Sequence, residues 1–575
     1  MKLRIAAVAV VAILLAAFAP GATTAAAGAA TPTEPTAYVV LFKQNTPDVA
    51  MVRFGQRFGS YTSLNTRVGL GTIISTDGDF LTQARTSRDV LYVAADRIMG
   101  QVAPYSNRPH GRLQSVQEAG RAVEQLTAER QAARVGPRTG TRGHPVRGEL
   151  GTGAAEPLAS LQADMSAMNV FEAQAIDQGS KRVRVGIIDT GVDGTHPDIA
   201  ANFDINLSRN FTVDIPAIDG ACVDEADGSC TDANNVDEDG HGTHVAGTIG
   251  APINGIGMSG VAPKVDLVNL RAGQDSGYFF VQPVVNALTY AGDNGIDVVN
   301  MSFYVDPWLY TCWANPADSP EDQIEQRLII VATNRALAYA RRHDVTLVSA
   351  LGNEHTDMGN PGLDDTSPDF GGDTYDRQID NATCIDIPAE SPGVISVSSV
   401  GPSGRKAYYS NYGTEQTDVA APGGDYRDFP GTDNYRTPGN LILAPYPLSV
   451  AQANGDVDAN GDPTSDFIVK SCNGATCGLY QYLQGTSMAA PHAAGVAALL
   501  VSRFGRRDGD GLGADPGLVE WALRLTATKT ACPNPATFVY PLLPASFTAT
   551  CVGTPAYNGF FGSGIVNALN AVKRR

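Results

Sequence analysis

Short, almost uninterrupted apolar runs alternate with helical patterns through the later two-thirds of this chain. The apolar runs are Val183–Ile188, Val265–Leu270, Asp297–Met301, Thr346–Leu351 and Val394–Val400, and helical patterns lie between them at Pro283–Ala291 and Gln326–Arg342. Strands that are apolar on both faces are typical of a parallel sheet covered by helices on both sides. The sequence therefore predicts an α/β fold of three layers, with functional residues at the carboxyl ends of the strands.

A serine stands where a turn meets a long apolar helix. Gly485-Thr486-Ser487 leads into an apolar helical pattern that continues to Leu500. The first N–H groups of a helix have no partner inside the helix, so Ser487 can offer both a hydroxyl and its own free N–H. Alone, such a serine is usually an N-cap, because a nucleophile also needs a base and an orienting carboxylate.

Two upstream segments offer that base and that carboxylate. Asp189 ends an apolar run, and His241 begins a second helical pattern of small residues. Imidazole titrates near neutral pH and can take the serine proton, while a buried carboxylate holds its tautomer. Each residue alone has an ordinary structural explanation, and only the three together predict a catalytic triad. We interpret His244 and His492, which lie in the same motifs, as structural.

With these segments in the order Asp189, His241 and Ser487, the chain resembles the subtilisin-like serine proteases, the subtilase family. The resemblance runs from about Pro157 to Val572. It implies a subtilisin-like fold and a secreted serine endopeptidase that hydrolyses peptide bonds of proteins or peptides through an acyl-enzyme. Two alternatives remain, a processing protease with one protein target and a catalytically idle binding protein on the same fold.

The resemblance assigns further residues to the site. Asn353 follows a predicted strand and matches the family's side-chain donor to the oxyanion. Ser302 matches the segment lining the primary specificity pocket. The family usually continues with Leu-Gly-Gly, whereas this chain continues with Phe303 and then the bulkier Tyr304 and Val305 in place of the glycines. The segment Asp275–Phe279, which contains Ser276, Gly277 and Tyr278, resembles the edge strand that pairs with substrate backbone. We expect an apolar or aromatic residue before the cut.

Calcium is the expected ion. The interval from His241 to Gly260 has the same length as the matching interval of the family, which carries the family's calcium loop. The resemblance assigns the side chains of Asp198 and Asn254, and the carbonyl groups of Pro252, Ile256 and Met258, as ligands. Oxygen ligands of this kind suit Ca²⁺. The alternative is a turn without metal, because Pro252 departs from the usual sequence.

The chain is predicted to have four parts. Residues 1–30 have the basic start, apolar run and small residues of a secretory signal peptide, and the apolar run is short for a membrane anchor. Residues 31–103 resemble the family's inhibitor-type propeptide, although an unrelated small α+β domain is the alternative. Residues 104–155 form a basic linker, with maturation cleavage between about Arg134 and Glu156. Residues 156–575 form the catalytic domain. Gly562–Ala568 resembles the family's last segment, so we expect no further module.

Within residues 31–103 the pattern is compact. Strands are predicted at Tyr38–Phe42, Gly71–Ser75 and Val90–Val93, and a helix at Asp48–Phe58. As the propeptide, this segment would be an intramolecular inhibitor of the catalytic domain.

Charge and cysteine usage constrain the partners. Residues 156–575 hold 24 Lys and Arg against 50 Asp and Glu, an acidic balance that argues against nucleic acid. We expect a monomer without a stable membrane anchor. All eight cysteines lie beyond residue 220, as expected for disulfides in an oxidising compartment. Among the 105 possible pairings we favour the local pairs Cys222–Cys230, Cys472–Cys477 and Cys532–Cys551, which leaves Cys312–Cys384.

Overall fold

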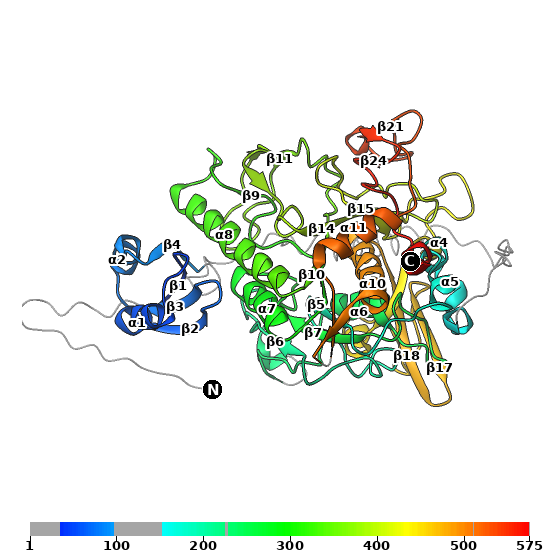
Figure 1. Cartoon of the computed structure of the whole chain (residues 1–575), viewed down its shortest axis with the longest axis horizontal. Coiled ribbons are helices and arrows are strands. Elements are labelled where there is room, and N and C mark those ends of the chain that lie inside the picture. The colour runs from blue at the N-terminus through cyan, green and yellow to red at the C-terminus, as the bar shows by residue number, and fades with distance from the viewer. Residues whose placement is uncertain (1–34, 97–151, 225–227, 510, 574–575) are drawn as a thin grey trace, which may run out of the picture.

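A computed structural model describes residues 35–96, 152–224, 228–509 and 511–573 of the chain (Figure 1). The predicted signal peptide and most of the predicted linker lie outside these residues, and so does the segment Gln114–Arg134, for which the sequence pattern also predicts a helix. None of the described helices combines the length and hydropathy needed to cross a membrane.

A seven-stranded parallel sheet forms the centre of the larger domain, in the order β15-β14-β10-β8-β5-β7-β6. Its strands are β5 (Arg184–Ile188), β6 (Arg209–Asn210), β7 (Asp266–Arg271), β8 (Val298–Met301), β10 (Thr346–Ala350), β14 (Val394–Val400) and β15 (Val419–Pro422). All five predicted strands are confirmed, and the two edge strands β15 and β6 are additional.

Helices cover both faces of this sheet (Figure 1). Successive strand residues point to opposite faces, so Ile187 packs in one apolar cluster and Ile188 in the other. The first cluster contains residues of α6 (His241–Gly250), α10 (Thr486–Phe504), α11 (Pro516–Thr526) and α12 (Ala568–Lys573). The second contains residues of α7 (Val281–Asp293) and α8 (Pro320–Arg342). The predicted three-layer α/β fold is therefore confirmed.

A small α+β domain precedes the larger one. Its antiparallel sheet has the order β2-β3-β1-β4, with two helices. The elements are β1 (Thr36–Phe42), α1 (Asp48–Phe58), β2 (Ser60–Asn65), β3 (Leu70–Ser75), α2 (Phe80–Thr86) and β4 (Val90–Ala95). The predicted strands and the predicted helix are confirmed, while β2 and α2 were missed.

The small domain packs against α7 and α8 of the larger domain (Figure 1). Leu41 and Leu70 belong to the same apolar cluster as these helices. The Nδ2 group of Asn65 donates to Oγ1 of Thr289 at 2.7 Å. Arg335 of α8 donates through Nη1 to the carbonyl oxygens of Phe42, at 2.8 Å, and Val68, at 3.0 Å. The contact thus combines buried apolar area with hydrogen bonds to β1 and to the turn before β3.

Smaller elements complete the larger domain. A three-stranded antiparallel sheet leads directly into α10, and two disulfides join neighbouring strands. The remaining elements are α4 (Ala163–Ala167), α5 (Val170–Gln174), β9 (Thr311–Cys312), β11 (Gly362–Asp364), β12 (Arg377–Ile379), β13 (Cys384–Ile385), β16 (Ile442–Tyr446), α9 (Leu448–Ala453), β17 (Ile468–Asn473), β18 (Thr476–Leu483), β19 (Arg506–Asp508), β20 (Gly511–Gly513), β21 (Thr537–Phe538), β22 (Ala549–Thr550), β23 (Gly553–Thr554) and β24 (Tyr557–Asn558).

Four disulfides confirm the favoured pairing. They are Cys222–Cys230, Cys312–Cys384, Cys472–Cys477 and Cys532–Cys551.

Candidate active site

A buried carboxylate and imidazole form the base of the site. Asp189 directly follows the last residue of β5, and His241 begins α6. Oδ1 of Asp189 accepts the N–H of Thr190 at 2.8 Å and lies 2.7 Å from Nδ1 of His241. The carboxylate therefore fixes the tautomer with the proton on Nδ1. Nε2 of His241 has no hydrogen-bond partner among the described residues, so it is free to accept a proton.

Opposing effects act on His241. Burial alone would lower its pKa, but the carboxylates of Asp189, Asp239 and Asp237 outweigh burial and raise the pKa to about 9. Asp237 is itself held by the N–H and hydroxyl of Thr243, at 2.9 and 2.6 Å. The imidazole is therefore mostly cationic at neutral pH and becomes a base as the pH rises.

Ser487 lies at the same edge of the sheet. The register pairs Ile188 with Met301, so the residues that follow them, Asp189 and Ser302, leave neighbouring strands together. The hydroxyl of Ser302 donates to the carbonyl of Ser487 at 3.1 Å, and the hydroxyl of Ser487 donates to the carbonyl of Ser302 at 3.4 Å. No hydrogen bond between Ser487 and His241 is found within the described ranges. Such contacts are often long before substrate binds.

Asn353 is oriented by the residue before the serine. Its Oδ1 accepts both the N–H and the hydroxyl of Thr486, each at 2.9 Å. The hydroxyl of Thr486 in turn accepts the N–H of Gly352 at 3.1 Å. Because the backbone N–H can only donate, it fixes which end of the amide is oxygen and leaves Nδ2 available as a donor. Sequence reasoning missed Thr486, although it adjoins Ser487.

A narrow cavity of about 30 Å³ opens beside the serine. Its lining residues come from the ends of β8 and β10, the start of α10 and the loop after β13. They are Ser302, Phe303, Tyr304, Leu309, Ala350, Gly352, Asn353, Glu354, Asp386, Thr486 and Ser487. Two predicted substrate-binding residues, Ser302 and Phe303, therefore line it. Glu354 and Asp386 also line it, and sequence reasoning missed both.

Comparison with known proteins identifies the family. The model of the subtilase family, peptidase family S8, matches residues 180–563. This chain belongs to the subtilase family. It is 27% identical to subtilisin DY of Bacillus licheniformis over 333 residues, which cover 58% of this chain and 81% of subtilisin DY. It is 26% identical to fervidolysin of Fervidobacterium pennivorans over 382 residues, 65% of this chain but only 41% of fervidolysin. This subtilase is accordingly a serine endopeptidase.

Solved structures agree on the fold. The epidermin leader peptide processing serine protease EpiP from Staphylococcus aureus superposes with a TM-score of 0.56 at 21% identity, covering 94% of this chain and 98% of EpiP. The structure of fervidolysin gives a TM-score of 0.51 at 20% identity, covering 94% of this chain and 61% of fervidolysin. At such identities the likeness supports the subtilisin-like fold alone.

One predicted element of the subtilase site is wrong. Asp275–Phe279 is a tight turn instead of an edge strand, because Gly277 N–H donates to Gln274 O at 2.8 Å and Gln274 N–H to Tyr278 O at 2.9 Å. Its backbone groups are thus partly used inside the turn. Ser276, Gly277 and Tyr278 do not line the cavity beside Ser487.

A buried charge cluster holds this turn. Among the described residues, Asp214, Asp232 and Asp275 form the one group of three or more acidic, histidine or cysteine side chains close enough to share a metal ion. The buried guanidinium of Arg271 already lies among them, 2.7 Å from Asp214 and 2.8 Å from Asp275, and it also contacts Asp232. The cluster therefore has an internal cation, and we interpret it as the anchor of the turn.

The predicted calcium loop of the subtilase passes a test of its donors. Oδ1 of Asp198 is buried and has no hydrogen-bond partner in the described parts of the chain, while Oδ2 accepts the N–H of Met258 at 2.9 Å. No hydrogen bond to the carbonyl oxygens of Pro252, Ile256 or Met258 is found among the described residues. These oxygens therefore remain available to a cation.

Two side chains shape this loop. Oδ1 of Asn254 accepts the N–H of Ile256 at 3.0 Å, which shows that its oxygen faces the loop backbone. The carboxylate of Glu156 accepts the N–H of Gly255 at 2.9 Å and was missed from sequence. Burial is the first cause that raises the pKa of Asp198, and the nearby Glu156 adds to it. Two close carboxylates favour a bound cation at this place.

The remaining motif histidines are engaged by the surrounding backbone. His244 Nε2 lies 3.1 Å from the carbonyl oxygen of Ile442, and burial lowers the pKa of His244 to about 3. His492 places Nδ1 at 2.8 Å from the carbonyl oxygen of Met488 and Nε2 at 2.9 Å from Asp164. Both rings join α-helices to neighbouring elements, which supports a structural interpretation.

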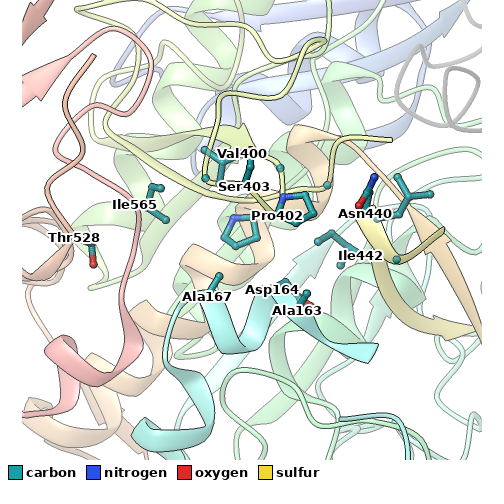
Figure 2. Close-up of a pocket in the computed structure, with 16 residues that line it drawn as sticks. Ala163, Asp164, Ala167, Val400, Pro402, Ser403, Asn440, Ile442, Thr528 and Ile565 are labelled. Carbon is teal, nitrogen blue, oxygen red and sulfur yellow. The ribbon is translucent and has the colours of Figure 1, made fainter. Parts of the chain in front are cut away.

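A larger cavity of about 230 Å³ lies where α4 faces the loop after β14 (Figure 2). Asp164 and Ala167 line it from α4, Val400 lines it from the end of β14, and Pro402 and Ser403 line it from the loop. Ser487, His241 and Asn353 are not among its lining residues. It is therefore separate from the candidate active site.

Proposed function

We propose that this subtilase is a secreted endopeptidase whose nucleophile is Ser487, with His241 as its base and Asp189 as the carboxylate that orients the base. The observation that carries the proposal is the buried pair of Asp189 and His241, 2.7 Å apart, with Nε2 of the imidazole unengaged. This pair lies at the edge of the sheet where Ser302 and Ser487 each donate a hydroxyl hydrogen bond to the other's carbonyl oxygen. These contacts support a proposal in which base, carboxylate and serine act together at this edge of the sheet.

The reaction follows from these positions. The hydroxyl of Ser487 turns from Ser302 toward Nε2 of His241, gives up its proton and attacks the carbonyl carbon of the peptide bond. The new imidazolium is stabilised by Asp189 and then protonates the departing amine. Water enters with His241 again as base and releases the acyl group from Ser487.

The oxyanion formed at each step needs donors that point at it in advance. Nδ2 of Asn353 is one, because Thr486 occupies the oxygen of the same amide. The backbone N–H of Ser487 is the other, because the second residue of a helix has no intrahelical acceptor. Both donors are fixed before substrate arrives, so no reorganisation is needed during the reaction.

The small domain is proposed to be the propeptide, which assists folding and inhibits the enzyme until it is removed. Its docking on α7 and α8 through Leu41, Asn65 and the backbone carbonyls bound by Arg335 supports this role. Removal by the enzyme itself between about Arg134 and Glu156 accounts for the linker sequence. Secretion accounts for the four disulfides.

Calcium is proposed as a structural ion held by Asp198, Asn254 and the carbonyls of Pro252, Ile256 and Met258. When bound, it would tie the loop after α6 to the segment before β6 and so stabilise the fold without taking part in the reaction. The unpartnered Oδ1 of Asp198 supports this assignment.

Peptide substrates are proposed to lie between the lining of the Ser302 and Phe303 cavity and the turn formed by Ser276, Gly277 and Tyr278. A second candidate is a processing protease with one target, which the insertion after Phe303 favours because it narrows this cavity. Digestion of a denatured protein mixture decides between them, since a general endopeptidase yields many fragments.

Expression of the full chain beside Ser487→Ala tests the enzyme itself. We expect the wild type to lose about its first 150 residues and to react with a serine-directed phosphonate, whereas the variant stays uncut and unlabelled. Ser502→Ala is the matched control, because Ser502 lies near the other end of α10 and donates to Asp177 at 3.1 Å. Labelling of the Ser487→Ala protein would refute the assignment of the nucleophile. Equal processing of both proteins would refute self-maturation.

A further inference from the structure

One buried and one half-buried carboxyl group line the cavity beside Ser487, and no cationic side chain of the described residues pairs with them. Glu354 follows the proposed oxyanion donor Asn353, and Asp386 follows strand β13. Asp386 is only 3% exposed. Among the described residues, neither carboxyl forms an ion pair with Lys, Arg or His. Buried carboxylates without a counter-charge are costly, so they either hold protons or await a cationic ligand.

The two carboxyls differ in what already holds them. Oε2 of Glu354 accepts the N–H of Asn353 at 2.9 Å and Nδ2 of Asn411 at 2.6 Å, which fixes this side chain. Oδ1 of Asp386 is buried without a hydrogen-bond partner in the described chain. Its backbone N–H donates to Glu390 at 2.7 Å, so a third carboxyl lies close behind. Oδ1 of Asp386 is therefore a buried acceptor without a donor among the described residues.

The shape of the cavity selects a slender occupant. The cavity has about 30 Å³ of space, and Phe303, Tyr304 and Leu309 narrow it. Such a space holds about two water molecules, so any side chain must displace its walls, and a slender alkyl stem displaces them less than an aromatic ring does. Lysine and arginine combine a slender apolar stem with a charged head that can reach buried acceptors. The cavity thus suits their stems along its wall and their heads at its acidic end.

We infer that this cavity is a subsite for the cationic side chain, arginine before lysine, of the residue that precedes the cleaved bond, with Asp386 and Glu354 as its acceptors. The inference rests on the proposed function, because it takes Ser487 as the nucleophile. It replaces the apolar or aromatic preference expected from sequence. A guanidinium offers five donors on two edges and can satisfy carboxylates from two directions, which an ammonium does less well.

The linker of the same chain supports this choice. Residues 104–150 contain eight arginines and no lysine. Four of these, Arg134, Arg138, Arg142 and Arg147, lie within the segment where maturation cleavage is predicted. An arginine subsite therefore matches the bond that the enzyme is proposed to cut in its own precursor.

Proton exchange should accompany binding. Burial is the main cause that raises the pKa of Asp386, with Glu390 and Glu354 adding to it, and burial likewise raises the pKa of Glu354. The pKa of buried Tyr310 is raised by the same three carboxyls after burial itself. Free carboxyls are therefore protonated at low pH, and a guanidinium binds only as they ionise. Selectivity for a cation should increase with pH.

The test uses four tetrapeptide coumarin amides. They differ only in the residue before the cleaved bond, which is arginine, citrulline, leucine or phenylalanine. Citrulline has the shape of arginine but no charge. We expect kcat/KM for arginine to exceed that for citrulline by roughly 10- to 100-fold, as for loss of a charged hydrogen bond. In Asp386→Asn, measured per phosphonate-titrated site, this ratio should fall to within a few fold of one. Asp365→Asn is the matched control, since it removes an exposed carboxylate of a neighbouring loop, and its ratio should stay at the wild-type value.

A ratio near one in the wild type, or a preference for phenylalanine in protein that the phosphonate labels, overturns the subsite and leaves the proposed enzyme intact. An unchanged ratio in Asp386→Asn overturns the role of Asp386. Absence of labelling refutes the proposed nucleophile instead. In that case, the binding of product tetrapeptides ending in arginine or citrulline still decides the subsite without catalysis. Tighter binding of the arginine peptide supports it, and equal binding refutes it.

Discussion

Replacing Thr486 by valine tests whether a buried hydroxyl holds the oxyanion donor in place. The hydroxyl of Thr486 donates to Oδ1 of Asn353 at 2.9 Å and accepts the N–H of Gly352 at 3.1 Å. Valine preserves the branched shape but removes both hydrogen bonds. Asn353 then keeps one anchor, the N–H of residue 486, in place of two.

The expected cost lies between two limits. A single hydrogen bond contributes about 0.5–1.5 kcal/mol, and complete loss of the corresponding donor in subtilisin costs about 2.7–4 kcal/mol of transition-state stabilisation. A loosened but present Asn353 should therefore cost about 1–2 kcal/mol, which is roughly a 5- to 30-fold decrease in kcat. KM should change little, because the oxyanion exists only in the transition state and its intermediate.

The assay compares kcat and KM of Thr486→Val and Thr486→Ser with wild type, together with the thermal midpoint of each protein. Serine keeps the hydroxyl, so Thr486→Ser should retain most of kcat. A lower thermal midpoint for valine with unchanged kcat would show that Thr486 supports the fold alone. Equal kcat values for the serine and valine variants would refute the proposed role of the hydroxyl.

Three further predictions concern the base, the small domain and the ion. For a substrate with a neutral side chain before the cleaved bond, kcat/KM should increase about tenfold per pH unit below the raised pKa of His241 and level off near pH 9. Asp239→Asn should shift this increase to lower pH. An increase centred near pH 6.5 in the wild type would contradict the effect of the buried carboxylates on the pKa of His241. Arg335→Ala removes two charged hydrogen bonds to the small domain, so the cleaved propeptide should dissociate from the catalytic domain about 10- to 100-fold faster. An unchanged dissociation rate would show that other contacts supply the binding energy. Chelation should lower the thermal midpoint of wild type by several degrees but hardly that of Asp198→Asn, and equal shifts would exclude a cation at Asp198.

The sequence predicted those parts of the site that follow directly from strand ends. Asp189, Ser302 and Asn353 each come after an apolar run, and parallel strands bring their carboxyl ends to one edge. His241 is the first residue of α6 and Ser487 the second residue of α10, and both helices start with small residues. Their roles were predicted only from Asp189, His241 and Ser487 together. These features are local in sequence, so they can be recognised without knowledge of tertiary contacts.

Asp386 was missed although a signal for it existed. The favoured disulfide between Cys312 and Cys384 already placed residue 384 beside the insertion that follows Phe303. Strand β13 pairs Cys384 with Cys312 and Ile385 with Thr311, so Asp386 emerges next to the cavity. The disulfide and the specificity pocket could therefore have been considered together. Glu354 adjoins Asn353 in sequence and needed no tertiary information.

The failure at Asp275–Phe279 has a different origin. The segment resembles a strand, but Asp275 is drawn to Arg271, and Asp219 accepts the N–H of Ser276 at 2.9 Å. Gly277 then adopts a φ of 84°, which closes the turn. Contacts with Asp214 and Asp219, more than fifty residues away in sequence, determine the backbone conformation of this turn. No local sequence pattern indicates these contacts.

An arginine subsite also bears on how the mature enzyme survives its own activity. Residues 156–575 carry only 24 lysines and arginines, against eight arginines in the 47 residues of 104–150. Several of those in the catalytic domain, including Arg271, Arg377 and Lys406, are fully buried and beyond reach of another molecule. Cleavage after arginine would thus concentrate on the linker while the folded domain offers few sites. Autolysis should accordingly be slow in the folded state. It should become rapid once chelation or heat exposes the buried residues, and the fragments should then end in arginine. Fragments that end mainly in apolar residues would contradict both the arginine subsite and this account of self-protection.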